Sequence, residues 1–204
     1  MVAEKIKTPN FLTVIVGILA IISASGFSYL IHQFAHIEAA EYFCNSNLSL
    51  MKGVLNVHND CILDHNCVMS VLAGPFSNIF LTIISLWILT KFPYNHFITS
   101  LALINASARI GEGFILLLQM LLFRYNPTIV NDERYVLGFI NFPDMSSALV
   151  ILFFYILFFG VMIIIGIRTF AWKGWWKWVF VSAAIILQIP LNALFQKYFY
   201  LLYG

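Results

Sequence analysis

Two histidines one helical turn apart are the residues best suited to chemistry in this sequence. They open and close the segment HQFAH, as His32 and His36. A helix places side chains at i and i+4 on one face, so both imidazoles can reach a single metal ion. The competing interpretation is a pair that arose by chance and is hydrogen-bonded between helices, because an imidazole inside an apolar span needs a partner.

A metal site of this kind needs a third ligand. Catalytic zinc sites have three protein ligands and one position open to water. Glu112 lies several residues inside an apolar run, at a depth that matches the histidines, so we expect it to be the third ligand. Asp132 and Asp144, in the polar segment 124–144, are the alternatives. Against these stand two plainer interpretations: an internal ion pair of Glu112 with Arg109, and aspartates that cap helices or face solvent.

The composition shows which elements must position these residues. The 204 residues are 61% hydrophobic and 10% charged, and the mean hydropathy is +0.90. A soluble domain has about 25% charged residues, so we predict an all-α, multi-pass integral membrane protein forming one domain over residues 1–204. Apolar runs long enough to cross a bilayer predict about five transmembrane helices. Their expected ranges are 11–43, 68–92, 96–123, 145–167 and 178–195.

The order of these spans predicts where the polar residues gather. With about five spans, the first and third spans end, and the second begins, at one membrane face. The first run exceeds one crossing, so we expect it to tilt, break near Gly26, or protrude. Pro190 predicts a kink in the last span, with Gln188 and Asn192 bonding the freed backbone groups. A net charge of +2 is too small to indicate a nucleic-acid partner.

Two motifs carry a family resemblance. The segment HQFAHIEAA, residues 32–40, resembles the H-E-F-G-H-A-x-A-A segment of the site-2 protease family of intramembrane zinc metalloproteases. The segment AGPFSN, residues 73–78, resembles the A-G-P-x-x-N signature of the same family. The resemblance covers residues 20–120. It implies a bound zinc ion, a membrane-embedded or membrane-proximal protein or peptide as substrate, and Asn78 as a substrate-binding residue, for which a hydrogen bond between helices is the alternative.

A third motif matches the family less closely. The family's third zinc ligand is an aspartate in an N-x-x-P-x-x-x-L-D-G pattern, and NASARIGEG, residues 105–113, resembles it. This segment has Glu112 in place of the aspartate, lacks the proline and leucine, and is one residue shorter in spacing. The resemblance therefore supports Glu112 as a zinc ligand only through the asparagine and the acid–glycine pair.

Residue 33 is the largest departure from the family. The resemblance places there a glutamate that takes a proton from the attacking water and passes it to the leaving amine. This chain has Gln33, whose amide forms hydrogen bonds but cannot accept that proton. Two explanations fit: a glutamate replaced to stop turnover, or a natural pseudoprotease that still binds zinc. In either case we expect this chain to be inactive.

Several function classes compete with the peptidase hypothesis. A non-catalytic zinc-binding membrane protein would capture a substrate helix or serve a regulatory partner. A membrane di-iron oxygenase is disfavoured, because such enzymes cluster about eight histidines and this chain has five. A transporter has only the Arg109 and Glu112 pair in its favour. Substrate selection would fall to the spans, the polar loops or a substrate-presenting partner protein.

Overall fold

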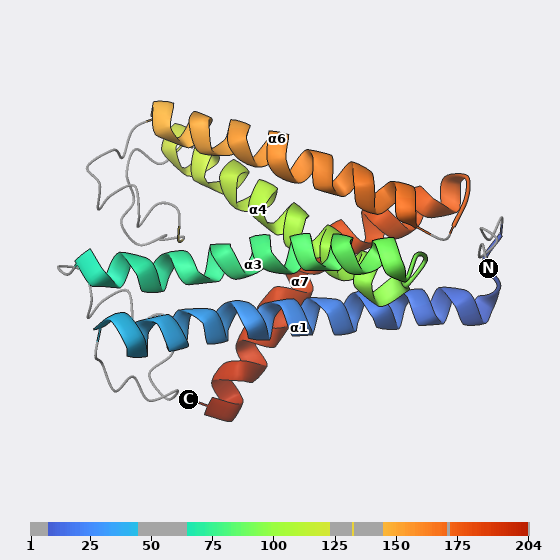
Figure 1. The fold of residues 1–204 in the computed structure, drawn as a ribbon, viewed down its shortest axis with the longest axis horizontal. Coiled ribbons are helices and arrows are strands. Elements are labelled where there is room, and N and C mark those ends of the chain that lie inside the picture. Colours follow the sequence, from blue (N-terminus) through green and yellow to red (C-terminus); the bar gives the residue numbers. More distant parts are fainter. Residues whose placement is uncertain (1–7, 45–64, 123–131, 133–144, 171, 204) are drawn as a thin grey trace.

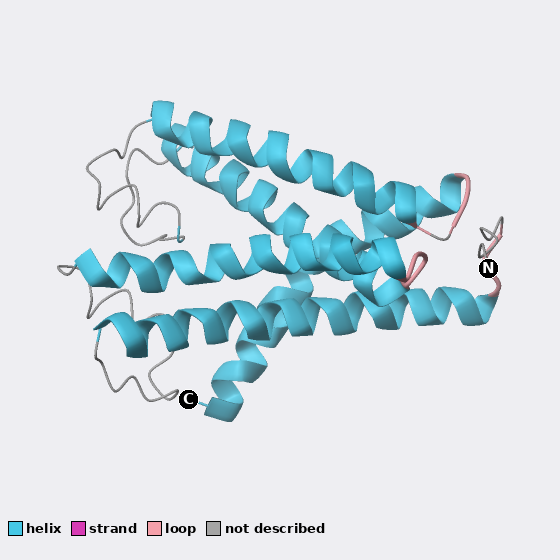
Figure 2. Cartoon of the chain, viewed as in Figure 1, coloured by secondary structure: helices cyan, strands magenta, loops and turns pink. Residues whose placement is uncertain are grey.

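The computed structural model describes residues 8–44, 65–122, 132, 145–170 and 172–203. These residues are helical apart from short turns (Figure 2). The helices are α1 (Phe11–Cys44), α3 (His65–Lys91), α4 (His96–Leu122), α6 (Met145–Thr169) and α7 (Trp175–Tyr203). The all-α prediction is therefore confirmed for the described part of the chain.

Asparagine caps explain where two of the helices begin. The first backbone N–H groups of a helix have no partner within it. Asn10 Oδ1 accepts the N–H of Thr13 at 2.8 Å at the start of α1. Asn95 Oδ1 accepts the N–H of Ile98 at 3.0 Å at the start of α4. Tyr94, just before the second cap, has a φ of 71°, which makes the turn from α3 into α4 tight.

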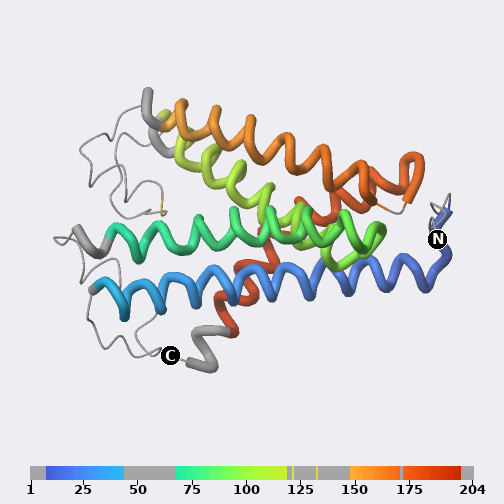
Figure 3. Tube along the Cα trace, in the orientation of Figure 1, coloured from blue at the N-terminus to red at the C-terminus, as the bar shows by residue number. Residues whose placement is uncertain are grey.

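Helix α4 is the centre of the bundle. It contacts each of the other four helices, while α1 also packs against α3 and α7. Consecutive helices alternate in direction, so α1, α4 and α7 end, and α3 and α6 begin, at the same end of the bundle (Figures 1 and 3). The prediction that the first and third spans end where the second begins is confirmed as an arrangement of helices.

All five helices are long and apolar enough to cross a membrane. The stretches that qualify are 11–43, 68–91, 96–118, 148–169 and 175–198, close to the predicted spans. Only 17% of an 18-residue apolar window within α6 is buried inside the protein, and exposed side chains such as Phe153 and Leu157 cover its outer face. A helix that is apolar on its outer face fits a lipid environment, consistent with a multi-pass membrane protein.

Helix α1 runs without interruption through Gly26. Its 34 residues correspond to about 51 Å at 1.5 Å per residue, well beyond a hydrocarbon core of about 30 Å. The expected break at Gly26 is therefore absent, which leaves tilting or protrusion to accommodate the length. Gly26 instead allows close packing, because a Cβ there would lie 3.0 Å from Phe195 Cζ in α7.

Candidate metal centre

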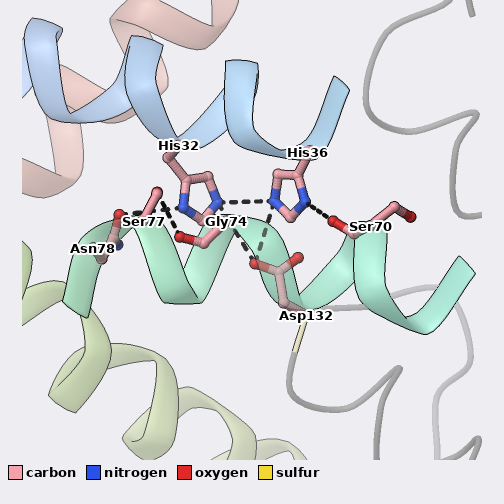
Figure 4. A network of polar contacts seen from close by, with 7 residues as sticks. All are labelled: His32, His36, Ser70, Gly74, Ser77, Asn78 and Asp132. Atoms are coloured by element: carbon pink, nitrogen blue, oxygen red, sulfur yellow. Dashed lines mark hydrogen bonds and ion pairs between the residues drawn. The ribbon is translucent and has the colours of Figure 1, made fainter. Parts of the chain in front are cut away.

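His32 and His36 share one face of α1 near its C-terminal end (Figure 4). Their Nε2 atoms lie 3.1 Å apart, and the two rings meet edge to face. The side chain of His36 is 2% exposed and that of His32 is 16% exposed. The i, i+4 spacing thus brings the two imidazole nitrogens together at a partly accessible point, as the sequence predicts.

The opposite ring nitrogens are fixed by α3. His36 Nδ1 lies 2.8 Å from the carbonyl oxygen of Ser70, which can only accept, so Nδ1 is the donor. His32 Nδ1 donates to Asn78 Oδ1 at 3.3 Å. In a neutral imidazole with its proton on Nδ1, Nε2 presents a lone pair. Helix α3 therefore turns two Nε2 lone pairs toward the same point, as in metal sites where a second hydrogen bond orients each histidine.

Asp132 completes a triangle with the histidine pair. Its Oδ2 lies 3.5 Å from His32 Nε2 and 3.6 Å from His36 Nε2 (Figure 4). Zinc–ligand bonds of about 2.1 Å at tetrahedral angles separate two ligand atoms by about 3.4 Å. The three sides of the triangle, 3.1, 3.5 and 3.6 Å, lie close to that value. This donor set of two imidazoles and a carboxylate fits a zinc ion with a fourth position left over.

The Asp132 carboxyl has the charge that a metal ligand requires. Burial would raise its pKa, but hydrogen bonds from His32 and His36 outweigh burial and hold the pKa well below its usual range when Nε2 carries a proton instead of a metal. The side chain is 14% exposed, so it is largely shielded from solvent. The group is thus an ionised carboxylate at neutral pH, suited to a divalent cation.

Gly74 makes room for the histidines. A Cβ at this position would lie 2.6 Å from His32 Cε1 and closer still to His36 Nε2. Real Cβ atoms essentially never approach another heavy atom so closely. Glycine therefore lets the backbone of α3 pass close to the two rings, whereas any Cβ at this position would force the imidazoles to shift. This gives the AGP segment a local structural reason beside its resemblance to a family signature.

The structure brings Asp132, and not Glu112, to the histidine pair. Among the described residues, the group of acids, histidines and cysteines able to share a metal consists of His32, His36 and Asp132. Glu112 instead lines a cavity beside His32. The expectation for Glu112 assumed that the third ligand must come from within a span, whereas a residue beyond the end of α4 reaches the site. Asp144 lies outside the described residues.

Asn78 is 3% exposed and holds the ring of His32. This contact links α1 to α3, which agrees with the alternative of a hydrogen bond between helices. Asn78 also lines the cavity beside the site. The substrate-binding prediction for this residue therefore stays a prediction.

A cavity of about 460 Å³ adjoins the metal centre. It lies between α1, α3, α4 and α7, and His32 and Gln33 form part of its wall. The polar residues around it are otherwise contributed by helices far apart in the sequence, namely Ser28, Asn78, Ser107, Arg109, Glu112, Gln188, Asn192 and Gln196. Its volume lies within the range of about 300–1,000 Å³ that is typical of ligand pockets.

Two features of the site are not among the sequence-based predictions. The Ser70 contact uses a backbone carbonyl, which every residue type carries. Gln188 was expected to bond backbone groups freed by Pro190, but its Oε1 accepts the Ser107 hydroxyl at 2.8 Å and joins α7 to α4. The 188, 192, 196 spacing of amides was the available signal that one face of α7 is polar.

No family model, curated protein or solved structure matches this chain.

Proposed function

We propose that this chain is an intramembrane zinc metallopeptidase whose general-base position holds a glutamine. The observation that carries the proposal is the triangle of His32 Nε2, His36 Nε2 and Asp132 Oδ2, with sides of 3.1–3.6 Å. The resemblance of segments 32–40 and 73–78 to the site-2 protease family supports it independently. The two lines of support meet physically, because Gly74 of the second segment packs against both histidines of the first.

The three ligands would come from two parts of the chain. His32 and His36 belong to α1, whereas Asp132 follows α4. Zinc held there would polarise a peptide carbonyl and lower the pKa of a water molecule, the chemistry of zinc peptidases. Asn78 and the Ser70 carbonyl keep the two imidazoles oriented for this role. The cavity beside His32 gives a peptide and water a place next to the ligands.

Gln33 decides what the site can do in its present form. It lines the cavity next to His32, where a general base would act. Its amide can hydrogen-bond a water molecule or a peptide group, but it cannot take up a proton at neutral pH. The chain would thus bind zinc and a substrate segment without cleaving it.

Gln33 also favours a second candidate, a natural pseudoprotease. Such a protein would use the same ligands and cavity to bind a membrane-embedded segment as its function. The codon for residue 33 in the source gene separates the two: glutamate there means a blocked peptidase, and glutamine means a natural non-catalytic binding protein.

Restoring the glutamate tests the proposal. The Gln33→Glu variant, loaded with zinc in detergent or nanodiscs, is expected to cleave members of a set of synthetic single-span peptides, with products identified by mass spectrometry. A Gln33→Glu, His36→Ala double variant is the matched control and is expected to be inactive. The proposal is contradicted by a Gln33→Glu protein that holds one zinc per chain but cleaves no peptide, or by a chain that binds no zinc.

A further inference from the structure

Helix α7 presents a row of amide side chains to the cavity. Gln188, Asn192 and Gln196 follow one another at i, i+4 and i+8, which places them on one face of a helix. All three line the cavity that also contains His32 and Gln33 in its wall. Figure 1 shows the C-terminal part of α7 running to the same end of the bundle as the end of α1.

This row is unusual for a span of such apolar composition. Neighbouring positions on α7, such as Ile186 and Leu194, are large, apolar and exposed. Gln188, by contrast, is 7% exposed and bonded through its Oε1 to Ser107 in α4. Polar side chains within membrane spans generally face protein or a water-filled cavity and mark functional paths. The three amides therefore form a polar lining of the cavity and are not scattered around the helix.

The chemistry of an amide matches that of a peptide bond. Each carboxamide both donates and accepts hydrogen bonds, as does each peptide group. A substrate helix that unwinds inside a membrane loses its internal hydrogen bonds and must find new ones in the protein. The first and last amides of the row are eight residue steps apart, about 12 Å along the helix. An extended chain covers that distance in about four residues at roughly 3.3 Å each.

We infer that Gln188, Asn192 and Gln196 form a binding subsite for about four residues of extended peptide main chain, leading to the metal centre. This inference rests on the proposed peptidase function and names its substrate class: an unwound segment recognised through its backbone. Backbone recognition would make the subsite tolerant of side-chain sequence. It would also operate with glutamine at residue 33, because binding needs no proton transfer.

A pair of small probes separates backbone binding from metal binding. The first is a tetra-alanine hydroxamate, whose hydroxamate chelates zinc and whose peptide groups can reach α7. The second is acetohydroxamate, which chelates zinc but has no peptide chain. Affinities are measured by calorimetry on the zinc-loaded full chain in nanodiscs. Replacing Gln188, Asn192 or Gln196 by leucine is expected to lower the affinity for the peptide probe about three- to tenfold, which corresponds to one lost hydrogen bond. The affinity for acetohydroxamate should not change.

Backbone specificity is tested by N-methylating the peptide probe. Methylation removes N–H donors, so it should weaken binding to the unaltered chain and have a smaller effect on Asn192→Leu. Ser182→Leu is the matched control, because Ser182 is an exposed polar residue of α7 that does not line the cavity. The inference would be overturned if the peptide probe bound the three leucine variants as tightly as it binds the unaltered chain. Zinc binding and the proposed function would be left standing by that result.

The subsite remains testable if zinc binding fails. A tetra-alanine amide carrying a photoreactive diazirine has no chelating group and so does not depend on the metal. Cross-links mapped to residues 188–196, and lost in Asn192→Leu but kept in Ser182→Leu, support the subsite whatever the metal content. Absence of labelling over 188–196 in the unaltered chain, with label found elsewhere or only on lipid, would overturn it.

Discussion

The backbone of Gly74 lies against the imidazole of His36 so closely that no Cβ fits between them. The contact joins the N-terminal half of α3 to the C-terminal part of α1 at the candidate metal centre. It makes residue 74 a sensitive point, because one methyl group there must displace a ring that is also held by Ser70.

Gly74→Ala is therefore expected to abolish tight zinc binding. The added methyl group pushes the rings of both histidines out of the triangle, and the overpacking costs about 1–3 kcal/mol of stability. Zinc content by mass spectrometry after dialysis is the measurement. Gly111→Ala is the matched control, since a Cβ at Gly111 meets nothing within 4 Å. Full zinc content in Gly74→Ala would show that the triangle is not the metal site.

Asp132→Asn and Glu112→Gln separate the two candidate third ligands. Both changes remove a charge with little change in shape. Loss of a residue that merely hydrogen-bonds a metal ligand weakens metal binding about 10- to 100-fold. Asp132→Asn should weaken zinc binding at least that much, because it removes a ligand itself. Glu112→Gln should retain zinc, since Glu112 lies outside the ligand group. Competition with a fluorescent chelator gives both affinities, and the reverse order would favour the sequence-based choice of Glu112.

Asn78→Ala should weaken zinc binding without removing a ligand. His32 would lose the acceptor that fixes its Nδ1 proton, and such losses cost about 10- to 100-fold in metal affinity. Asn78→Asp keeps an acceptor at the same place and is expected to recover most of the affinity. Equal zinc affinities of the Asn78→Asp and Asn78→Ala variants would mean that the contact does not orient His32.

Ser28→Ala should lower stability and leave zinc content unchanged. Ser28 Oγ donates to Asn105 Oδ1 at 2.8 Å in a buried contact between α1 and α4. Hydrogen bonds between membrane helices contribute about 0.6 kcal/mol on average, with a maximum near 1.7 kcal/mol. Unfolding in mixed micelles measures the loss, and Ser23→Ala, at an exposed position of α1, is the control. Equal stability of the two variants would contradict a structural role for this bond.

The helices could be predicted from the sequence because a helix that crosses a bilayer needs about 20 consecutive apolar residues, and such runs stand out in the hydropathy. The expected 96–123 span and the observed His96–Leu122 helix agree closely. The last helix extends further than expected, to Tyr203, because aromatic and polar residues beyond 195 lowered the apolar signal without ending the helix. Gly26 shows the limit in the other direction: a glycine that suggested a break serves close packing against Phe195.

The site could be predicted only in the part that follows helical periodicity. His32 and His36 share a face by spacing alone, and the structure keeps them together. Asp132 lies in a polar segment, where neither period nor hydropathy fixes the path of the chain. Depth within a span favoured Glu112, but a residue outside the spans can return to a site near the end of the bundle. The spacing of the three amides of α7 can be read from the sequence. That they share a cavity with His32 cannot, because it depends on how α1 and α7 pack together.

The distance along the chain between His36 and Asp132 has a consequence for biosynthesis. A nascent chain that has produced α1, α3 and α4 holds both histidines and Gly74 but only two of the three ligand side chains. The complete set of proposed ligands would exist only after residue 132 has been made and Asp132 has come within reach of His32 and His36. Metal loading at the proposed site would therefore be a late event, and an incompletely synthesised chain would lack the full set of proposed ligands.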